Sequence, residues 1–424
     1  MHDQAHTLRY ATRTTTHPMP GAVPPGEPEH DAGMLRISVA VDELLVDDGE
    51  TVERFDFAGR RRTTLRRATQ TKRTASLLAY VLGHESGMAS ALHVLDVMRA
   101  GGALQDAAIW QVEAAFGLHS TTVDSPEVEE TITRQADDNG WRWLVGEREL
   151  TRVHPVAAPP KMPPRGLLRL FAYGLCLHPT IAAELAERGA LPSTLSADDH
   201  FPLRQRVRTF ELKEVEPGNL DFAAMAAEFR DEPPADEVLA PIGRPLDPAS
   251  DVRLDEARAS LARGDLLDAI LAVFAHNWAY VANTGELVRD IFSKAGWLSP
   301  IKKIPELVSP ASSKQAAAKQ LAGLVKLRSK TGRYAHVLDV LIGEKHTEVG
   351  QVEEACRAFS SALTRDPGLA ATWVSLGRTY LAQRRFEDGW DCFDHADRLC
   401  PQHKVVGDVH LLDAEIRARH GYLF

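Results

Sequence analysis

Two stretches near the C-terminal end carry the same kinds of residues at the same spacing. Counted from Ala370 as position 1, the second stretch has Trp373 at position 4, Leu376 at 7, Gly377 at 8, Tyr380 at 11, Phe386 at 17, Gly389 at 20, Phe393 at 24, Ala396 at 27 and Pro401 at 32. Counted from His336, the first stretch has Ile342, Gly343, Ala355, Phe359, Ala362 and Pro367 at positions 7, 8, 20, 24, 27 and 32. The chain therefore contains a repeat with a period of 34 residues.

This spacing has a direct physical meaning. Small residues at positions 8, 20 and 27 let two consecutive helices approach closely, and large apolar residues fill the space between them. The proline at position 32 ends the second helix, because proline is not tolerated in a helix interior. Each stretch is thus predicted to form a pair of packed antiparallel helices.

The pattern resembles the tetratricopeptide repeat over residues 336–403, although alanine is usual where Gly389 stands, and Asp339 and His346 replace large apolar residues. The resemblance implies an α-solenoid that binds a protein, as a peptide or a helix, on a concave face lined by the first helix of each pair. The groove residues that it implies are Val337, Val340, Glu344, Thr347, Ala371, Val374, Arg378, Leu381 and Asp408.

One subfamily of these repeats grips C-terminal carboxylates with lysine and asparagine at positions 5 and 9 of the first helix. Here those positions hold Val340, Glu344, Val374 and Arg378, so the carboxylate clamp is absent. We expect Val340 and Val374 to form neighbouring apolar spots with charge of both signs one turn further along. The predicted ligand is an apolar segment flanked by charge.

A weaker copy of the pattern starts near Ser250. Ala257, Gly264, Ala269 and Val273 fall at positions 8, 15, 20 and 24 of this copy. Residues 284–335 do not fit the period and are predicted to be an irregular insertion with a basic amphipathic helix, while the residues after Pro401 fit a capping helix.

Proline-rich stretches divide the rest of the chain. We predict a disordered tail (1–33), an α+β domain (34–153), a linker (154–165), a small helical segment (166–230), a second linker (231–250) and the repeat domain (251–424). The predicted fold class is mostly α, an α-solenoid preceded by a small α+β domain. Within that domain, Asp48-Gly49 is predicted to be a hairpin turn.

Composition limits the class of protein. The chain has 424 residues, 44% hydrophobic and 25% charged, with a formal net charge of -10 and four scattered cysteines. These values are typical of a globular protein in a reducing compartment and argue against a protein that coats nucleic acid. No apolar run is long enough for a signal peptide or a membrane span, so a cytoplasmic location is predicted.

A basic stretch in the α+β domain supports an alternative function. Together with a loose similarity of residues 34–153 to a winged helix, it suggests a nucleic-acid-binding regulator. The competing interpretation is a solvated segment whose charges pair with an acidic helix over 124–138. The candidate nucleic-acid-binding residues are Arg60, Arg61, Arg62, Arg66, Arg67, Lys72 and Arg73.

Other chemistries find little support in the sequence. Cys392, His395, Cys400 and His403 have the ligand types of a zinc site, but the repeat places the first two inside a helix, so no metal and no cofactor are predicted. No phosphate-binding loop, zinc-protease motif or nucleophile elbow occurs, so no catalytic residue is assigned and an enzyme is not expected. The favoured prediction is an adaptor or scaffold that binds a protein partner.

Overall fold

The computed structural model describes residues 5–17, 29–100, 132–137, 139–201, 204–218, 220–242, 252–280, 284–296, 300–329, 331 and 333–420. The chain divides into two compact units. Unit 1 comprises Met1–Glu232 with Ile416–Phe424, and unit 2 comprises Pro233–Glu415.

Unit 1 contains a twelve-stranded sheet in the order β12-β6-β5-β4-β3-β2-β1-β11-β10-β9-β8-β7. The sheet is antiparallel except where β12 runs parallel to β6. Its strands are β1 (His6–His17), β2 (Glu29–Val39), β3 (Glu43–Asp47), β4 (Thr51–Asp56), β5 (Arg61–Arg66), β6 (Thr71–Ser76), β7 (Thr133–Asp137), β8 (Gly140–Val145), β9 (Arg148–Pro155), β10 (Pro192–Phe201), β11 (Arg204–Pro217) and β12 (Arg230–Asp231).

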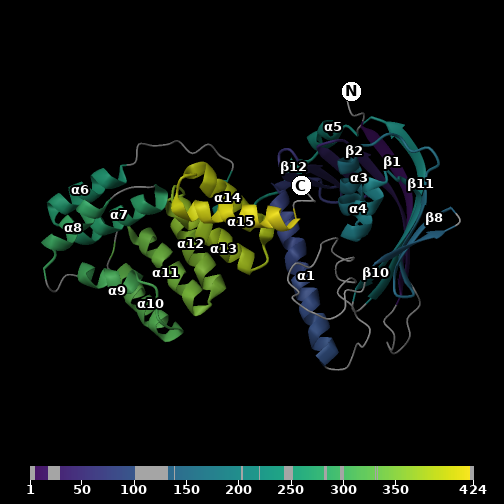
Figure 1. The fold of residues 1–424 in the computed structure, drawn as a ribbon. Helices are drawn as coiled ribbons and strands as arrows, with labels where there is room; N and C mark the ends of the chain where they lie inside the picture. Colours follow the sequence, from purple (N-terminus) through teal and green to yellow (C-terminus); the bar gives the residue numbers. More distant parts are fainter. Residues whose placement is uncertain are drawn as a thin grey trace. The chain divides into compact units, whose positions relative to one another are not determined.

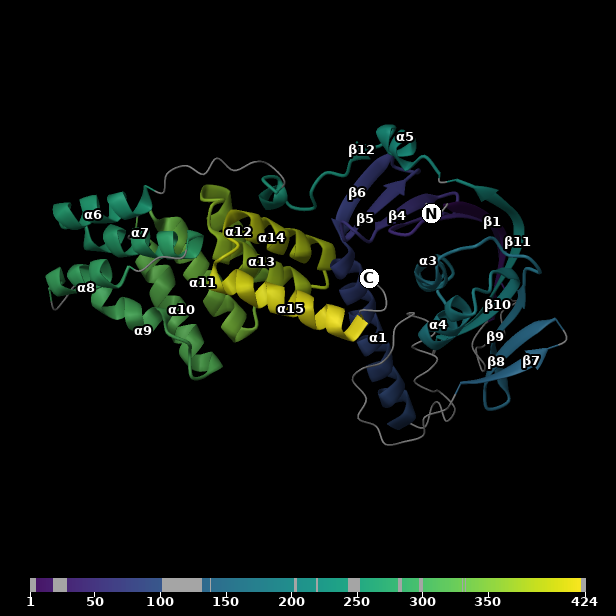
Figure 2. The ribbon, with the colours of Figure 1, turned by 45° about the horizontal axis from the view of Figure 1, so that its top comes forward.

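The sheet is strongly curved and has helices on its concave side (Figures 1 and 2). Helices α3 (Pro164–Arg169) and α4 (Pro179–Glu187) lie inside the curve, joined by a π-helical turn over Leu170–Gly174. The long helix α1 (Leu77–Ala100) follows β6, and the short helix α5 (Phe222–Ala227) packs on the opposite, convex side against Val52 and Leu65.

The core of unit 1 follows the two-residue period of its strands. On the concave side, Tyr10, Ile37 and Phe55 are fully buried. The ring of Phe55 lies 4.8 Å from that of Tyr173 on the π-helical turn. The alternate residues of these strands face the convex side.

Unit 2 is built from helices (Figure 1). They are α6 (Arg253–Arg263), α7 (Leu266–Ala279), α8 (Gly285–Lys294), α9 (Ile304–Val308), α10 (Lys314–Arg328), α11 (Ala335–Val349), α12 (Val352–Arg365), α13 (Ala370–Ala382), α14 (Phe386–Leu399) and α15 (Lys404–His420), whose last residues belong to unit 1. The helix pairs predicted from the 34-residue spacing are therefore present as α11–α12 and α13–α14.

The glycines at position 8 explain how closely these pairs pack. A Cβ atom added to Gly343 would lie 2.6 Å from the Phe359 ring, and one added to Gly377 would lie 2.5 Å from the Phe393 ring. Such distances are too short for any side chain larger than hydrogen. The repeat therefore requires glycine at this position wherever phenylalanine fills position 24.

The predicted fold class, mostly α with a small α+β domain, is wrong. The described residues of the N-terminal half form a large sheet instead, and they do not adopt a winged helix. Residues expected to be a disordered tail form β1 and the start of β2, and residues 34–153 and 166–230 contribute strands to the same sheet. Most of the acidic helix expected over 124–138 lies outside the described residues, but residues 133–137 form the strand β7.

The second predicted linker is also partly structured. Its first residue, Asp231, belongs to β12, and Val238 and Leu239 are buried in unit 2. Asp236 accepts a hydrogen bond of 2.7 Å from the Tyr380 hydroxyl. In contrast, the hairpin predicted at Asp48-Gly49 is confirmed, with Gly49 at φ 94°.

Candidate functional site

The predicted groove lies on helices α11 and α13, but its first half is closed. Val337, Val340, Ala371 and Val374 are buried, with at most 7% of their surface exposed. Helix α7 packs against both α11 and α13, and its own residues Ile270, Leu271, Ala272 and Val273 are fully buried. The prediction that the two valines are exposed apolar spots is therefore wrong, because they belong to the core between these helices.

One helical turn further along, the same face opens into a cavity of about 210 Å³. We call it the α11–α13 pocket. Its lining residues are Glu344, Thr347, Val352, Phe359, Ser375, Arg378, Thr379 and Ala382. Three of the predicted groove residues, Glu344, Thr347 and Arg378, are thus brought together.

The pocket has an apolar floor and polar walls. The ring of Phe359 and the side chain of Val352 come from α12, beneath the two first helices. The Thr347 hydroxyl donates to the Gly343 carbonyl oxygen at 3.1 Å, and the Thr379 hydroxyl donates to that of Ser375 at 2.8 Å. Since both hydroxyl protons are used within the helices, these oxygens can only accept hydrogen bonds from a ligand.

Glu344 is the most perturbed acid of this region. Burial raises its pKa to about 7, and Glu348 adds to the shift against the opposing effect of Lys345. The Lys345 ammonium group is itself engaged, because it donates to the Ser309 carbonyl oxygen at 2.7 Å and to Glu348 at 2.8 Å. Glu344 is therefore a mostly buried carboxyl group for which a cationic ligand would be a favourable partner.

Arg378 stands on the opposite wall. Its guanidinium lies 3.2 Å from the Asp408 carboxylate on α15, and both side chains are about half exposed. An exposed pair of this kind contributes little to folding and can be exchanged for an ion pair with a ligand. Asp408 thus joins the site through Arg378, whereas Leu381, another predicted groove residue, is not part of the pocket lining.

Sequence reasoning missed the residues from α12 and the far side of α13. Phe359 was assigned only to the core, and Ser375, Thr379 and Ala382 fall at positions to which the repeat pattern gives no role. The available signal was the position of Glu344 and Arg378, one turn beyond the valines. These two residues indicated the open end of the groove, but not the α12 residues Val352 and Phe359 that form its floor.

The predicted basic stretch lies on β5, β6 and the turn between them, where carboxylates balance much of its charge. Arg62 pairs with Glu53, Arg66 with Glu232 at 2.5 Å, Arg67 with Asp47 at 2.7 Å and Lys72 with Asp231 at 3.7 Å. These four partners belong to the sheet and its edge, while most of the acidic segment 124–138 lies outside the described residues. Arg60, Arg61 and Arg73 also lie on these strands and their turns. The nucleic-acid interpretation gains no support from this pairing and stays a prediction.

Cys392, His395, Cys400 and His403 are not arranged as a metal site. In the part of the chain that the structure describes, no group of three or more cysteine, histidine or acidic side chains could hold a metal ion. His403 contacts the Asn277 carbonyl oxygen at 2.9 Å, while His395 packs edge-on against the Trp373 ring.

Comparison with known protein families and curated sequences does not indicate a family for this chain. No protein-family model matches the chain, and no curated protein matches it in sequence. Among the described helices, none has the length and apolar character needed to cross a membrane.

Proposed function

We propose that this protein is an adaptor that binds a short segment of a partner protein in the α11–α13 pocket. The observation that carries the proposal is the pocket itself, at the predicted groove position, with an apolar floor between an acidic and a basic wall. The resemblance of α11–α14 to tetratricopeptide repeats supports it, because such repeats bind peptides along their first helices.

The size of the pocket favours a peptide over a free small molecule. A cavity of about 210 Å³ is smaller than the ~300–1,000 Å³ of ordinary small-molecule sites. It suits a single apolar side chain anchored over Phe359 and Val352. The rest of the segment then lies along the helices, where its N–H groups can donate to Thr347 and Thr379.

The charges of Glu344 and Arg378 indicate which residues should lie on either side of the anchored apolar side chain in the peptide. A lysine or arginine on one side would pair with Glu344, and an acidic residue on the other would replace Asp408 beside Arg378. The proposed ligand is therefore an apolar residue between a basic and an acidic one. Glu344 becomes ionised when it is paired, since a neighbouring cation lowers the pKa of a carboxyl group.

The proposal is tested by selecting peptides from a displayed random library on the full chain. The selected peptides should share an apolar residue flanked by charge of both signs. Ala382→Trp places a large ring at the exposed rim of the pocket and should abolish their binding. Ala414→Trp is the matched control, because Ala414 is also exposed, on α15, and lies outside the pocket lining.

The proposal fails if the selected peptides bind the Ala382→Trp protein as well as the control. It also fails if the selection yields no shared pattern. Thermal melting of both variants separates a blocked pocket from a lost fold.

A further inference from the structure

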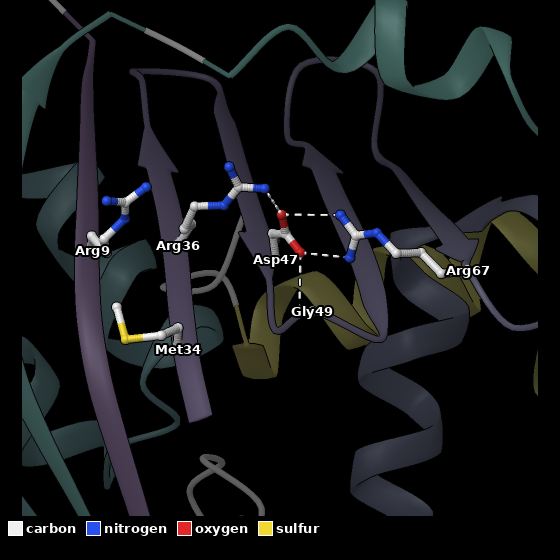
Figure 3. A pocket seen from close by; sticks show the side chains of 6 residues that line it. All are labelled: Arg9, Met34, Arg36, Asp47, Gly49 and Arg67. Atoms are coloured by element: carbon white, nitrogen blue, oxygen red, sulfur yellow. Dashed lines mark hydrogen bonds and ion pairs between the residues drawn. The ribbon is translucent and has the colours of Figure 1, made fainter. Parts of the chain in front are cut away.

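The convex face of the sheet in unit 1 holds a second cavity, about 480 Å³ in volume and open to solvent. We call it the convex-face pocket. Figure 3 shows its lining residues, which come from β1, β2, β3 and the two adjoining turns. They are Arg9, Met34, Arg36, Asp47, Gly49 and Arg67.

Asp47 fixes two of the three guanidinium groups. Its carboxylate is 2% exposed and accepts hydrogen bonds from Arg36, from both amino groups of Arg67 at 2.7 and 3.1 Å, and from the Gly49 N–H at 3.1 Å. Burial raises the pKa of Asp47, but the bonds from Arg67 and Arg36 outweigh it and lower the pKa overall. Asp47 is therefore a permanent anion that holds both arginines in place.

Arg9 adds a positive charge that Asp47 does not balance. Arg9 and Arg36 are direct cross-strand partners on β1 and β2, and like charges placed opposite each other destabilise a sheet. Among the described residues, Arg9 pairs with Glu214 at 3.1 Å, and both of these side chains are nearly half exposed. Three guanidinium groups face the buried Asp47 carboxylate and the half-exposed Glu214, so one positive charge is unbalanced, and two are once a ligand displaces Glu214 from Arg9.

Met34 supplies the apolar part of the pocket. It lies two residues before Arg36 on the same face of β2, and it is 46% exposed, which is rare for a large apolar side chain in the described chain. In Figure 3 its thioether lies beneath the side chains of Arg9 and Arg36. An organic group bound beside the arginines would cover it.

We propose that the convex-face pocket binds a small organic phosphomonoester, with the phosphate between Arg9 and Arg36 and its organic group over Met34. A phosphate dianion that displaces Glu214 from Arg9 matches the charge then left at the pocket, and its oxygens can accept hydrogen bonds from two guanidinium groups at once. A carboxylate carries half this charge, and the paired hydrogen bonds of one guanidinium group are enough to bind it. Because Asp47 has already fixed Arg36 and Arg67, little conformational entropy is lost when the ligand binds.

The proposal is tested with phenyl phosphate, using calorimetry on the full chain at low salt. Inorganic phosphate and benzoate serve as comparison ligands. Phenyl phosphate should bind more tightly than both, because only it engages the arginines as a dianion and also covers Met34. Arg9→Gln should weaken it about tenfold or more, as expected for the loss of a charge-assisted hydrogen bond.

Two further variants make the test specific. Arg13→Gln is the matched control, because Arg13 lies on the same strand but outside the lining of this pocket, and it should change the affinity less than about twofold. Glu214→Gln should tighten binding a few-fold, since it releases Arg9 from its competing partner.

Equal weakening by Arg9→Gln and Arg13→Gln would overturn the proposal, because it would indicate diffuse attraction to a basic surface. Benzoate binding as tightly as phenyl phosphate would contradict recognition of a phosphate dianion. Inorganic phosphate binding as tightly would contradict the role of Met34. Absence of any binding heat with phenyl phosphate, together with no shift in melting temperature, would also overturn it. All these variants change exposed residues, so the fold is not at risk.

Discussion

The two ends of the face shared by α11 and α13 differ in how far solvent reaches them, although the repeat pattern places both on the same side of the helices. At one end Val340 and Val374 are fully buried, with α7 packed against both helices. One turn along, Glu344 and Arg378 line an open pocket. The difference teaches that a repeat pattern defines which residues share a face, whereas a neighbouring helix decides which of them stay accessible.

The first prediction tests the closed end. Val374→Asp should destabilise unit 2 by about 4 kcal/mol or more, because it places an unpaired charge in the core. Thr347→Asp, at the exposed end of α11, should cost less than about 1 kcal/mol. Urea unfolding followed by circular dichroism measures both. Similar small losses would show that α7 does not cover the valines in solution.

The second prediction tests the packing between the two helices of a repeat, α13 and α14. Phe393→Ala should cost about 3–4 kcal/mol, as expected when a fully buried aromatic ring is removed. The ring packs directly against Gly377, whose lack of a side chain leaves no group to fill the cavity. A thermal melt that hardly moves would contradict the repeat register.

The third prediction uses a buried histidine of α14, His395, which packs against Trp373 of α13. Burial, aided by Arg398, lowers the pKa of His395 to about 4. The unfolded chain therefore binds an extra proton between about pH 6.5 and 4, and stability is lost as the pH falls through this window. The loss should reach about 2 kcal/mol by pH 5. His395→Leu should remove this dependence in urea unfolding at pH 7 and 5, and an unchanged dependence would assign it to other groups.

The fourth prediction concerns the open end, where we expect stability to change with pH in the opposite direction to the His395 effect. The pKa of Glu344 is raised to about 7, so the folded protein holds a proton that the unfolded chain loses above about pH 4.5. Stability from this group falls as the pH rises from about 4.5 to 7, by about 1 kcal/mol for a carboxyl group that solvent still reaches. Glu344→Gln should flatten this slope. A slope that stays the same would mean that Glu344 is solvated and ionised.

The helical unit was largely predictable because its contacts are local. The 34-residue spacing predicted helices that the structure places at Ala335–Val349, Val352–Arg365, Ala370–Ala382 and Phe386–Leu399. The basic amphipathic helix predicted within residues 284–335 is present as α10, with Ala317 and Leu324 fully buried. The spacing could not predict that α7 covers α11 and α13, because the apolar pattern of a helix shows that one face is buried but not which helix buries it.

The single large sheet was missed because the pairings that join its hairpins, such as β1 with β11 and β9 with β10, are distant in the sequence. Strand β1 pairs with β11, so that Leu8 lies opposite Val215. Buried Leu8 and Tyr10 lie on either side of exposed Arg9, which is a strand pattern, but the polar residues and prolines of this segment favoured a disordered tail. The same alternation places Arg9 in the convex-face pocket, which a reading of local composition could not find.

The most direct test of the central claim is a double-mutant cycle between Glu344 and the basic residue of a selected peptide. Glu344→Gln is combined with replacement of that peptide residue by glutamine, and the four dissociation constants are measured by calorimetry. Glu353→Gln, exposed on α12, is the control. Pairing in the α11–α13 pocket predicts a coupling energy of about 1.5 kcal/mol or more for Glu344 and none for Glu353. A coupling below about 0.5 kcal/mol at Glu344 would contradict the claim that this pocket holds the partner segment.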